Sequence, residues 1–181
     1  MVPTAGPPVS PCLRAAGWAE ATVLAAGVEA IRTGRVPPEA TAAPTAGAAT
    51  VRAPHGATAT AEVTVDASGW PEAVDVELAC GPPLDPIVLR SFATGAAHMA
   101  LGWVCSEGIA VDELGVPTDL TIRSFGVLRA RDTPPIDVRI VDDSVGEPVN
   151  GSDAVFAAVA AATWIAQGLP SRWPTRRGRN P

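Results

Sequence analysis

Residues 154–162 read Ala-Val-Phe-Ala-Ala-Val-Ala-Ala-Ala, an unbroken apolar run that follows Ser152 and Asp153. Alanine is the best helix former, and serine and aspartate are favoured N-cap residues, so the run predicts a helix capped by Ser152 or Asp153. A helix with apolar side chains all round must be buried or must meet a partner. Whatever fold this chain adopts has to surround this helix.

Two alternating segments earlier in the chain predict a β-hairpin. Residues 58–66 and 74–80 each alternate apolar with polar side chains, which is the pattern of a half-buried strand. Between them, Asp66-Ala67-Ser68-Gly69 supplies typical turn residues. Residues 119–129 and 136–140 predict two further strands.

Two more helices complete the expected elements. Pro11 suits a first helical position after Ser10 as the cap, and Gly34 is a stop signal, so residues 11–33 predict a helix. Asp85-Pro86 begins another helix that runs to about Cys105. The order helix, two strands, helix, two strands, helix predicts an α+β fold, a two-layer sandwich in which helices pack on β-hairpins or a mixed sheet.

Proline and glycine are concentrated near both ends and between residues 34 and 56. We therefore expect a disordered N-terminus (1–10), an N-terminal helix with a Pro/Ala-rich connection (11–56), one organised domain (57–173) and a basic disordered tail (174–181). The connection is the segment most open to local disorder.

Composition argues against several classes of protein. The net charge is −6 and the chain contains no lysine, so a nucleic-acid surface is not expected. No segment has the roughly 20 continuous apolar residues that span a bilayer, and no membrane is expected as a partner. Three distant cysteines indicate neither a disulfide framework nor a zinc or iron–sulfur site, which favours the cytoplasm.

The step Gly146-Glu147-Pro148 places one carboxylate between two residues that shape the backbone. Glycine allows positive φ or close approach of the backbone to a ligand, and proline fixes the chain just after the acid. This arrangement can hold Glu147 at the edge of a cavity. By residue type alone, the favoured interpretation of Glu147 is a structural carboxylate that accepts hydrogen bonds from loop amides or the start of the next helix.

Around this step, several segments in order resemble the C-terminal molybdenum-cofactor domain in the large subunit of the xanthine dehydrogenase and aldehyde oxidase family. Ala-Glu-Val-Thr-Val-Asp at 61–66 is similar to the family's strand before a hairpin, and Leu101-Gly102-Trp103 to the end of its glycine-rich helix. The resemblance covers about residues 57–173. The matching segments are 61–66, 80–86, 95–103, 125–134, 145–148 and 152–162.

The resemblance implies a role for particular residues. In that family the glutamate of the Gly-Glu-Pro step is the catalytic base in the hydroxylation of an N-heterocycle or an aldehyde, which would make Glu147 the base. No side chain of this chain is expected to ligate the metal. Against the molybdenum–molybdopterin cofactor the resemblance places Gly95, Ala96, Met99, Gly102, Val145 and Gly146.

The resemblance also implies partners. This chain lacks the upstream half of the cofactor site and has no iron–sulfur or FAD site, so it would act with other molybdenum-hydroxylase subunits that provide them. Met99 and Phe92 stand where the family has glutamine, and methionine offers no hydrogen-bond donor. A second interpretation is therefore a degenerate, non-catalytic interaction domain that has lost the cofactor, and a third is a truncated product.

Overall fold

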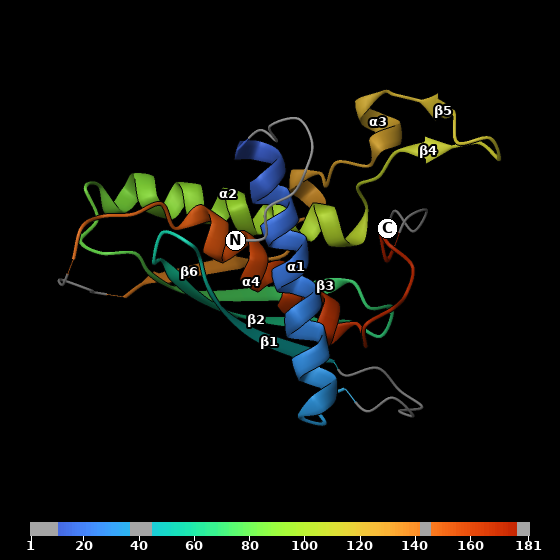
Figure 1. The fold of residues 1–181 in the computed structure, drawn as a ribbon. Coiled ribbons are helices and arrows are strands. Elements are labelled where there is room, and N and C mark those ends of the chain that lie inside the picture. The colour runs from blue at the N-terminus through green and yellow to red at the C-terminus, as the bar shows by residue number, and fades with distance from the viewer. Residues whose placement is uncertain (1–10, 37–44, 142–145, 177–181) are drawn as a thin grey trace, which may run out of the picture.

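The computed structural model describes residues 11–36, 45–141 and 146–176. Figure 1 shows helices gathered over one face of a sheet, with a narrow extension at one end. In chain order the elements are α1 (Pro11–Arg32), β1 (Ala46–Arg52), β2 (Thr58–Val65), β3 (Pro71–Ala79), α2 (Pro86–Cys105), β4 (Ala110–Val111), β5 (Pro117–Asp119), α3 (Ile122–Phe125), the 3-10 turn η1 (Ala130–Asp132), β6 (Ile136–Ile140) and α4 (Ser152–Ala166).

The main sheet is mixed and has the order β1-β2-β3-β6. β1, β2 and β3 pair antiparallel, and β6 lies parallel to β3 after a crossover that includes α2. On β2 and β3 the side chains alternate between buried and exposed, with Val63, Val76 and Leu78 facing inward. These observations confirm the predicted α+β fold, with the helices packed on one face of the sheet.

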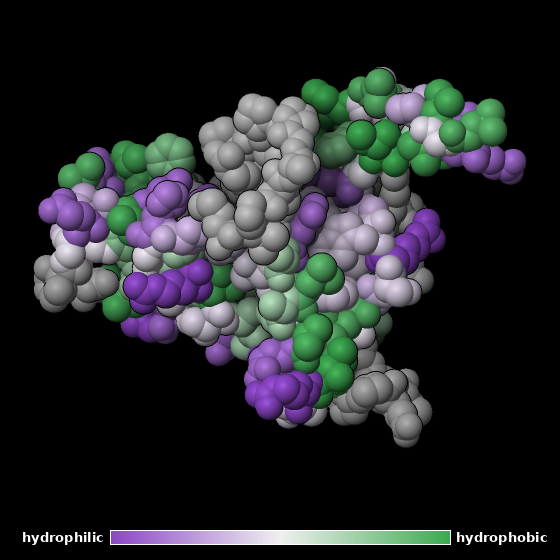
Figure 2. Space-filling model, in the orientation of Figure 1, coloured by the Kyte–Doolittle hydropathy of each residue, from purple (hydrophilic) through white to green (hydrophobic). Residues whose placement is uncertain are grey.

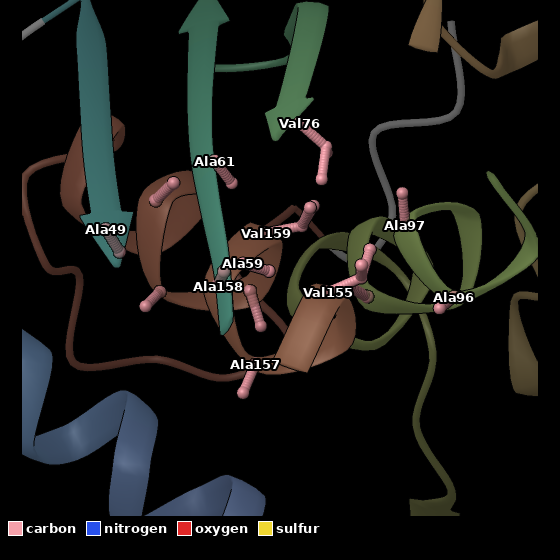
Figure 3. Packing of buried hydrophobic residues seen from close by; sticks show 14 of the residues in the cluster. Ala49, Ala59, Ala61, Val76, Ala96, Ala97, Val155, Ala157, Ala158 and Val159 are labelled. Carbon is pink, nitrogen blue, oxygen red and sulfur yellow. The ribbon is translucent and has the colours of Figure 1, made fainter. Parts of the chain in front are cut away.

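The apolar helix α4 lies at the centre of the core. It packs against β1, β2 and β3 on one side and against α1 and α2 on others. Figure 3 shows its small side chains directed at Ala59 and Ala61 of β2 and at α2. A Cβ atom on Gly47 of β1 would overlap the carbonyl oxygen of Ala162 and lie 2.5 Å from the amide nitrogen of Ala166. The prediction of a buried helix is confirmed.

Three local predictions were wrong. The supposed connection contains β1, which pairs with β2 along its whole length. Most of residues 119–129 is not a strand, because Thr121 caps the short helix α3 and Gly126 ends it with a φ of 82°. The N-cap of α4 is Gly151, where a Cβ atom would lie 2.8 Å from the Leu78 side chain. In residues 119–129, the local cap and the glycine end a helix where a strand was expected. At the start of α4, the close approach of Leu78 leaves room only for a glycine.

The C-terminal end of the described chain is hydrogen-bonded to the end of α2. The amides of Thr175 and Arg176, which fall in the predicted tail, donate to the carbonyls of Val104 and Cys105, at 2.8 Å each. Ser10 and the remaining residues of 1–10, 37–44 and 177–181 lie outside the described residues. Among the described helices, none is both long and apolar enough to cross a membrane.

Candidate functional site

The candidate site lies where two parallel strands end. Because β3 and β6 run parallel, the chain leaves both strands at the same end of the sheet, and residues 80–85 and 146–151 lie beyond it. The amide of Val149 donates to the carbonyl of Cys80 at 3.0 Å. A Cβ atom on Gly81, whose φ is 78°, would lie 2.6 Å from the carbonyl oxygen of Glu147. The glycine therefore lets the Glu147 backbone rest directly on the first loop.

A hollow of about 350 Å³ opens beside this junction, between the start of α2 and the start of α4. Its main polar side chains are already engaged by backbone: Asp85 accepts from the amides of Ile87 and Val88, and Asn150 accepts from Ser152. The remaining surface is mostly apolar, which suits an apolar part of a ligand. The lining residues are Cys80, Pro83, Leu84, Asp85, Val88, Leu89, Phe92, Pro148, Val149, Asn150, Gly151 and Ser152.

Glu147 is at the rim of this hollow rather than inside it. The residue is exposed, and Pro148, the next residue, lines the hollow. Gly146 has a φ of 115°, a conformation that favours glycine, so the chain turns sharply just before the acid. No described residue donates a hydrogen bond to the carboxylate. Its geometry leaves the carboxylate open to a group that arrives from outside the chain.

The outer face of α2 continues the wall of the hollow. Val88, Phe92, Gly95 and Met99 are spaced by four, three and four residues, so they share one face of the helix. All four are exposed, with Phe92 65% and Met99 54% accessible. A Cβ atom on Gly95 would meet no atom within 4 Å. The glycine is therefore not required by packing within this chain, and it leaves bare backbone on the open face.

The other residues expected at a cofactor take different positions. Ala96 is buried against the core, and a Cβ atom on Gly102 would overlap the carboxylate of Glu107. Burial raises the pKa of Glu107. Ala96 and Gly102 therefore face the protein interior, whereas Gly95 and Met99 are accessible to a ligand. Val145 lies outside the described residues.

Outside the hollow, His98 and Cys105 are two other side chains that could take part in catalysis or metal binding. The hydroxyl of Thr133 lies 3.0 Å from Nδ1 of His98, so this histidine is hydrogen-bonded within the chain. Burial raises the pKa of Cys105 to about 11, which leaves its thiol protonated and unreactive near neutral pH. No cluster of three or more metal-ligating residues occurs within the described ranges.

Sequence reasoning missed the hollow. Val88 and Leu89 fit the apolar pattern of a helix and Leu84 directly precedes its N-cap, although Leu84 and Val88 are exposed. The start of α2 carried a signal that was missed. Its apolar residues are too frequent to lie on one buried face, which indicates exposed apolar surface. Only the meeting of the two loops shows that this surplus surface borders the Gly146-Glu147-Pro148 step.

Comparison with solved structures finds the same fold in two oxidoreductases. Quinoline 2-oxidoreductase from Pseudomonas putida 86 matches with a TM-score of 0.52 and 20% identity, over 62% of this chain and 16% of that chain. The Cu,Mo-CO dehydrogenase in its carbon monoxide reduced state matches with a TM-score of 0.51 and 15% identity, over 61% and 15%. No family model and no curated protein matches the sequence. The present chain thus spans about one sixth of the length of these proteins.

Proposed function

We propose that this chain is a cofactor-binding domain of a molybdenum hydroxylase of the xanthine dehydrogenase and aldehyde oxidase type, active only within a larger assembly. The observation that carries the proposal is the position of Glu147 at the rim of an apolar hollow, in a fold shared with quinoline 2-oxidoreductase and the Cu,Mo-CO dehydrogenase. The ordered resemblance of the sequence supports the same family. The substrate class would be an N-heterocycle or an aldehyde.

The residues present fit one wall of such a cofactor site. Gly95 offers open backbone on an exposed face of α2, and the adjoining hollow is apolar. A bound molybdenum cofactor would supply the oxygen-transfer and electron chemistry. Gly95, Met99 and Gly146 would line it, and other subunits would supply the remaining wall together with the iron–sulfur and FAD sites.

Within that assembly this chain would contribute a positioned proton acceptor. Pro148 and the contact with Gly81 hold the Glu147 backbone, so the carboxylate is directed from a fixed base. An incoming subunit that closes over the rim would exclude water from the carboxylate and strengthen its interaction with a bound substrate. Glu147 would then accept a proton at its carboxylate oxygen during the reaction.

The test is co-expression with the polypeptides encoded beside it, followed by molybdenum analysis and turnover assays on the purified assembly. Glu147→Gln should reduce turnover by at least about 100-fold, the usual contribution of a general base, with molybdenum content unchanged. Glu62→Gln is the matched control, because Glu62 is exposed on the opposite face of the sheet. Full turnover in Glu147→Gln would remove Glu147 from the role of base.

A second candidate is a non-catalytic interaction domain. The large apolar side chains of Phe92 and Met99 on the open face of α2 favour it, because they offer a docking partner contact area but no amide donor to a cofactor. Met99→Gln separates the two candidates. In a cofactor domain it should raise the molybdenum content of the assembly, whereas in an interaction domain it should weaken association and bring no metal.

A further inference from the structure

Residues 108–127 form an extension that we call the arm. It contains the two-stranded ribbon of β4 and β5 and the short helix α3, and it projects from the end of α2 away from the sheet (Figure 1). Figure 2 shows that apolar residues cover much of its visible surface. Its exposed large apolar residues are Ile109, Val111, Leu114, Val116, Leu120, Ile122, Phe125 and Val127.

The arm has a defined backbone in spite of this exposure. The Asp112 carboxylate accepts from the amides of Leu114 and Val116, which closes the tip, and the amide of Gly108 donates to the carbonyl of Phe125 at the base. Polar bonds therefore set the shape of the arm, while the apolar side chains of the tip are left in solvent. Leu114 and Ile122 are 88% and 80% accessible.

An ordered backbone that holds apolar side chains in water is unfavourable for a surface without a partner. A two-stranded ribbon is marginally stable alone, and exposed apolar patches of this kind mark contact surfaces. Cys105, just before the arm, and Leu128, just beyond it, both join the main core, whereas no described residue of the arm does, so the arm is held only at its base. Its apolar side chains would be buried if another polypeptide enclosed the ribbon.

We propose that the arm docks into an apolar groove with a basic rim on the polypeptide that carries the other half of the cofactor site. This inference rests on the proposed function. Two observations select this partner. The matched region makes up about one sixth of each of those chains, so in those proteins the same fold is joined to much more polypeptide. The arm also contains three acids, Asp112, Glu113 and Asp119, and one base, Arg123, which suits a basic rim.

The position of the arm agrees with this assignment. It follows directly from α2, whose outer face carries Gly95 and Met99, the accessible residues expected at the cofactor. A partner that binds the arm is therefore held next to the end of α2. In the proposed function, the same partner faces α2 from the other side of the cofactor. A second copy of this chain is a less suitable occupant, because each copy carries a net charge of −6 and two such copies repel each other.

Photo-crosslinking in the native host tests this docking and identifies the partner directly. The full chain carries p-benzoylphenylalanine in place of Glu113 at the tip, or in place of Leu24 on α1 as a control, since Leu24 is also exposed. We expect the Glu113 position to give a strong crosslink to a polypeptide that mass spectrometry identifies as the remaining portion of a molybdenum hydroxylase. A crosslinked dimer of this chain, an unrelated product, or no product above the Leu24 control would overturn the proposal.

A matched set of variants then tests whether the apolar side chains are responsible. Leu114→Gln, Leu120→Gln and Ile122→Gln combined should reduce the crosslink yield about tenfold or more, as expected when several interface contacts are lost. Leu24→Gln with Val28→Gln should leave it unchanged. An equal yield in both sets would overturn the proposal.

The outcome is independent of catalysis. The same crosslink is expected in the Glu147→Gln background, because docking does not need the carboxylate. A retained crosslink with no molybdenum would leave the arm assigned and the proposed function refuted, whereas a loaded, active assembly without an arm crosslink would refute the arm alone.

Discussion

Helix α4 and the arm are both rich in apolar residues, yet they have opposite environments. Every residue from Ala157 to Thr163 of α4 is buried, whereas most large apolar residues of the arm are exposed. The small side chains of α4 let the sheet and two helices approach it, as the contact with Gly47 shows. The arm has larger side chains and a narrow backbone that encloses nothing. Apolar content therefore predicts a need for contact, and shape decides whether the chain meets that need itself.

A leucine in each environment gives the largest expected difference. Leu78→Ala, beneath α4, should lower the free energy of unfolding by about 2–5 kcal/mol, because it opens a cavity in the core. Leu114→Ala at the tip of the arm should change it by less than about 0.5 kcal/mol. Urea denaturation monitored by circular dichroism measures both. Similar losses in the two variants would show that the arm belongs to the cooperative core.

A pair of glycines tests the close approach around α4. Gly47→Ala should reduce stability by about 1–3 kcal/mol, since the new methyl group would overlap the backbone of α4. Gly17→Ala in α1, where a Cβ atom meets nothing within 4 Å, should instead stabilise by up to about 1 kcal/mol through helix propensity. Thermal unfolding of the two variants provides the comparison. A neutral Gly47→Ala would mean that α4 and β1 are less tightly packed.

Glu107, at the junction between the core and the arm, should make the stability of the fold depend on pH. Burial raises the pKa of Glu107, so the folded state binds its proton more tightly than the unfolded state. The protonated form of Glu107 therefore stabilises the folded state. This contribution is fully present below the ordinary pKa of glutamate and is lost as pH rises through the raised pKa. Glu107→Gln removes the dependence, and its stability relative to the parent chain should therefore increase from about pH 4 to about pH 8.

Melting curves across this range measure the effect, which should be smaller than that of Leu78→Ala because Glu107 is only half-buried. Glu113→Gln on the exposed arm serves as the control. A difference between Glu107→Gln and the parent chain that stays constant with pH would contradict the assigned cause.

The smallest effect is expected from polar substitutions on the arm. Leu120→Gln and Ile122→Gln should each change the stability of the isolated chain by less than about 0.5 kcal/mol, since both side chains are already in water. Differential scanning calorimetry would detect a larger change. A marked loss of stability would show that the arm contacts its own chain in solution, which would remove the basis of the docking proposal.

Particular elements show how far the sequence could predict the fold. The hairpin of β2 and β3 and the start of α2 were predicted because alternation, turn residues and the Asp85 cap act locally. β1 was missed because Ala-Gly-Ala-Ala-Thr has little β-propensity, and it is a strand only through pairing with β2 and contact with α4. Residues 119–129 have a pattern that predicts a strand, and local caps make part of them a helix instead.

The candidate site was predictable only in part. The Gly146-Glu147-Pro148 step and the glycines of α2 were visible as residues, and the positive φ of Gly146 agrees with one reason given for that glycine. The sequence did not show which of the expected cofactor residues are accessible. Gly95 and Gly102 look alike in the sequence, yet one borders open space and the other faces Glu107.

By itself the sequence determined the main helices, the hairpin and the need to bury the helix at 152–166, because capping, alternation and side-chain volume act over a few residues. Only the tertiary structure decided that the loops after β3 and β6 meet beside Glu147 and that the arm exposes its apolar residues. Both depend on which distant segments come together, and that is fixed by strand pairing and by packing around α4.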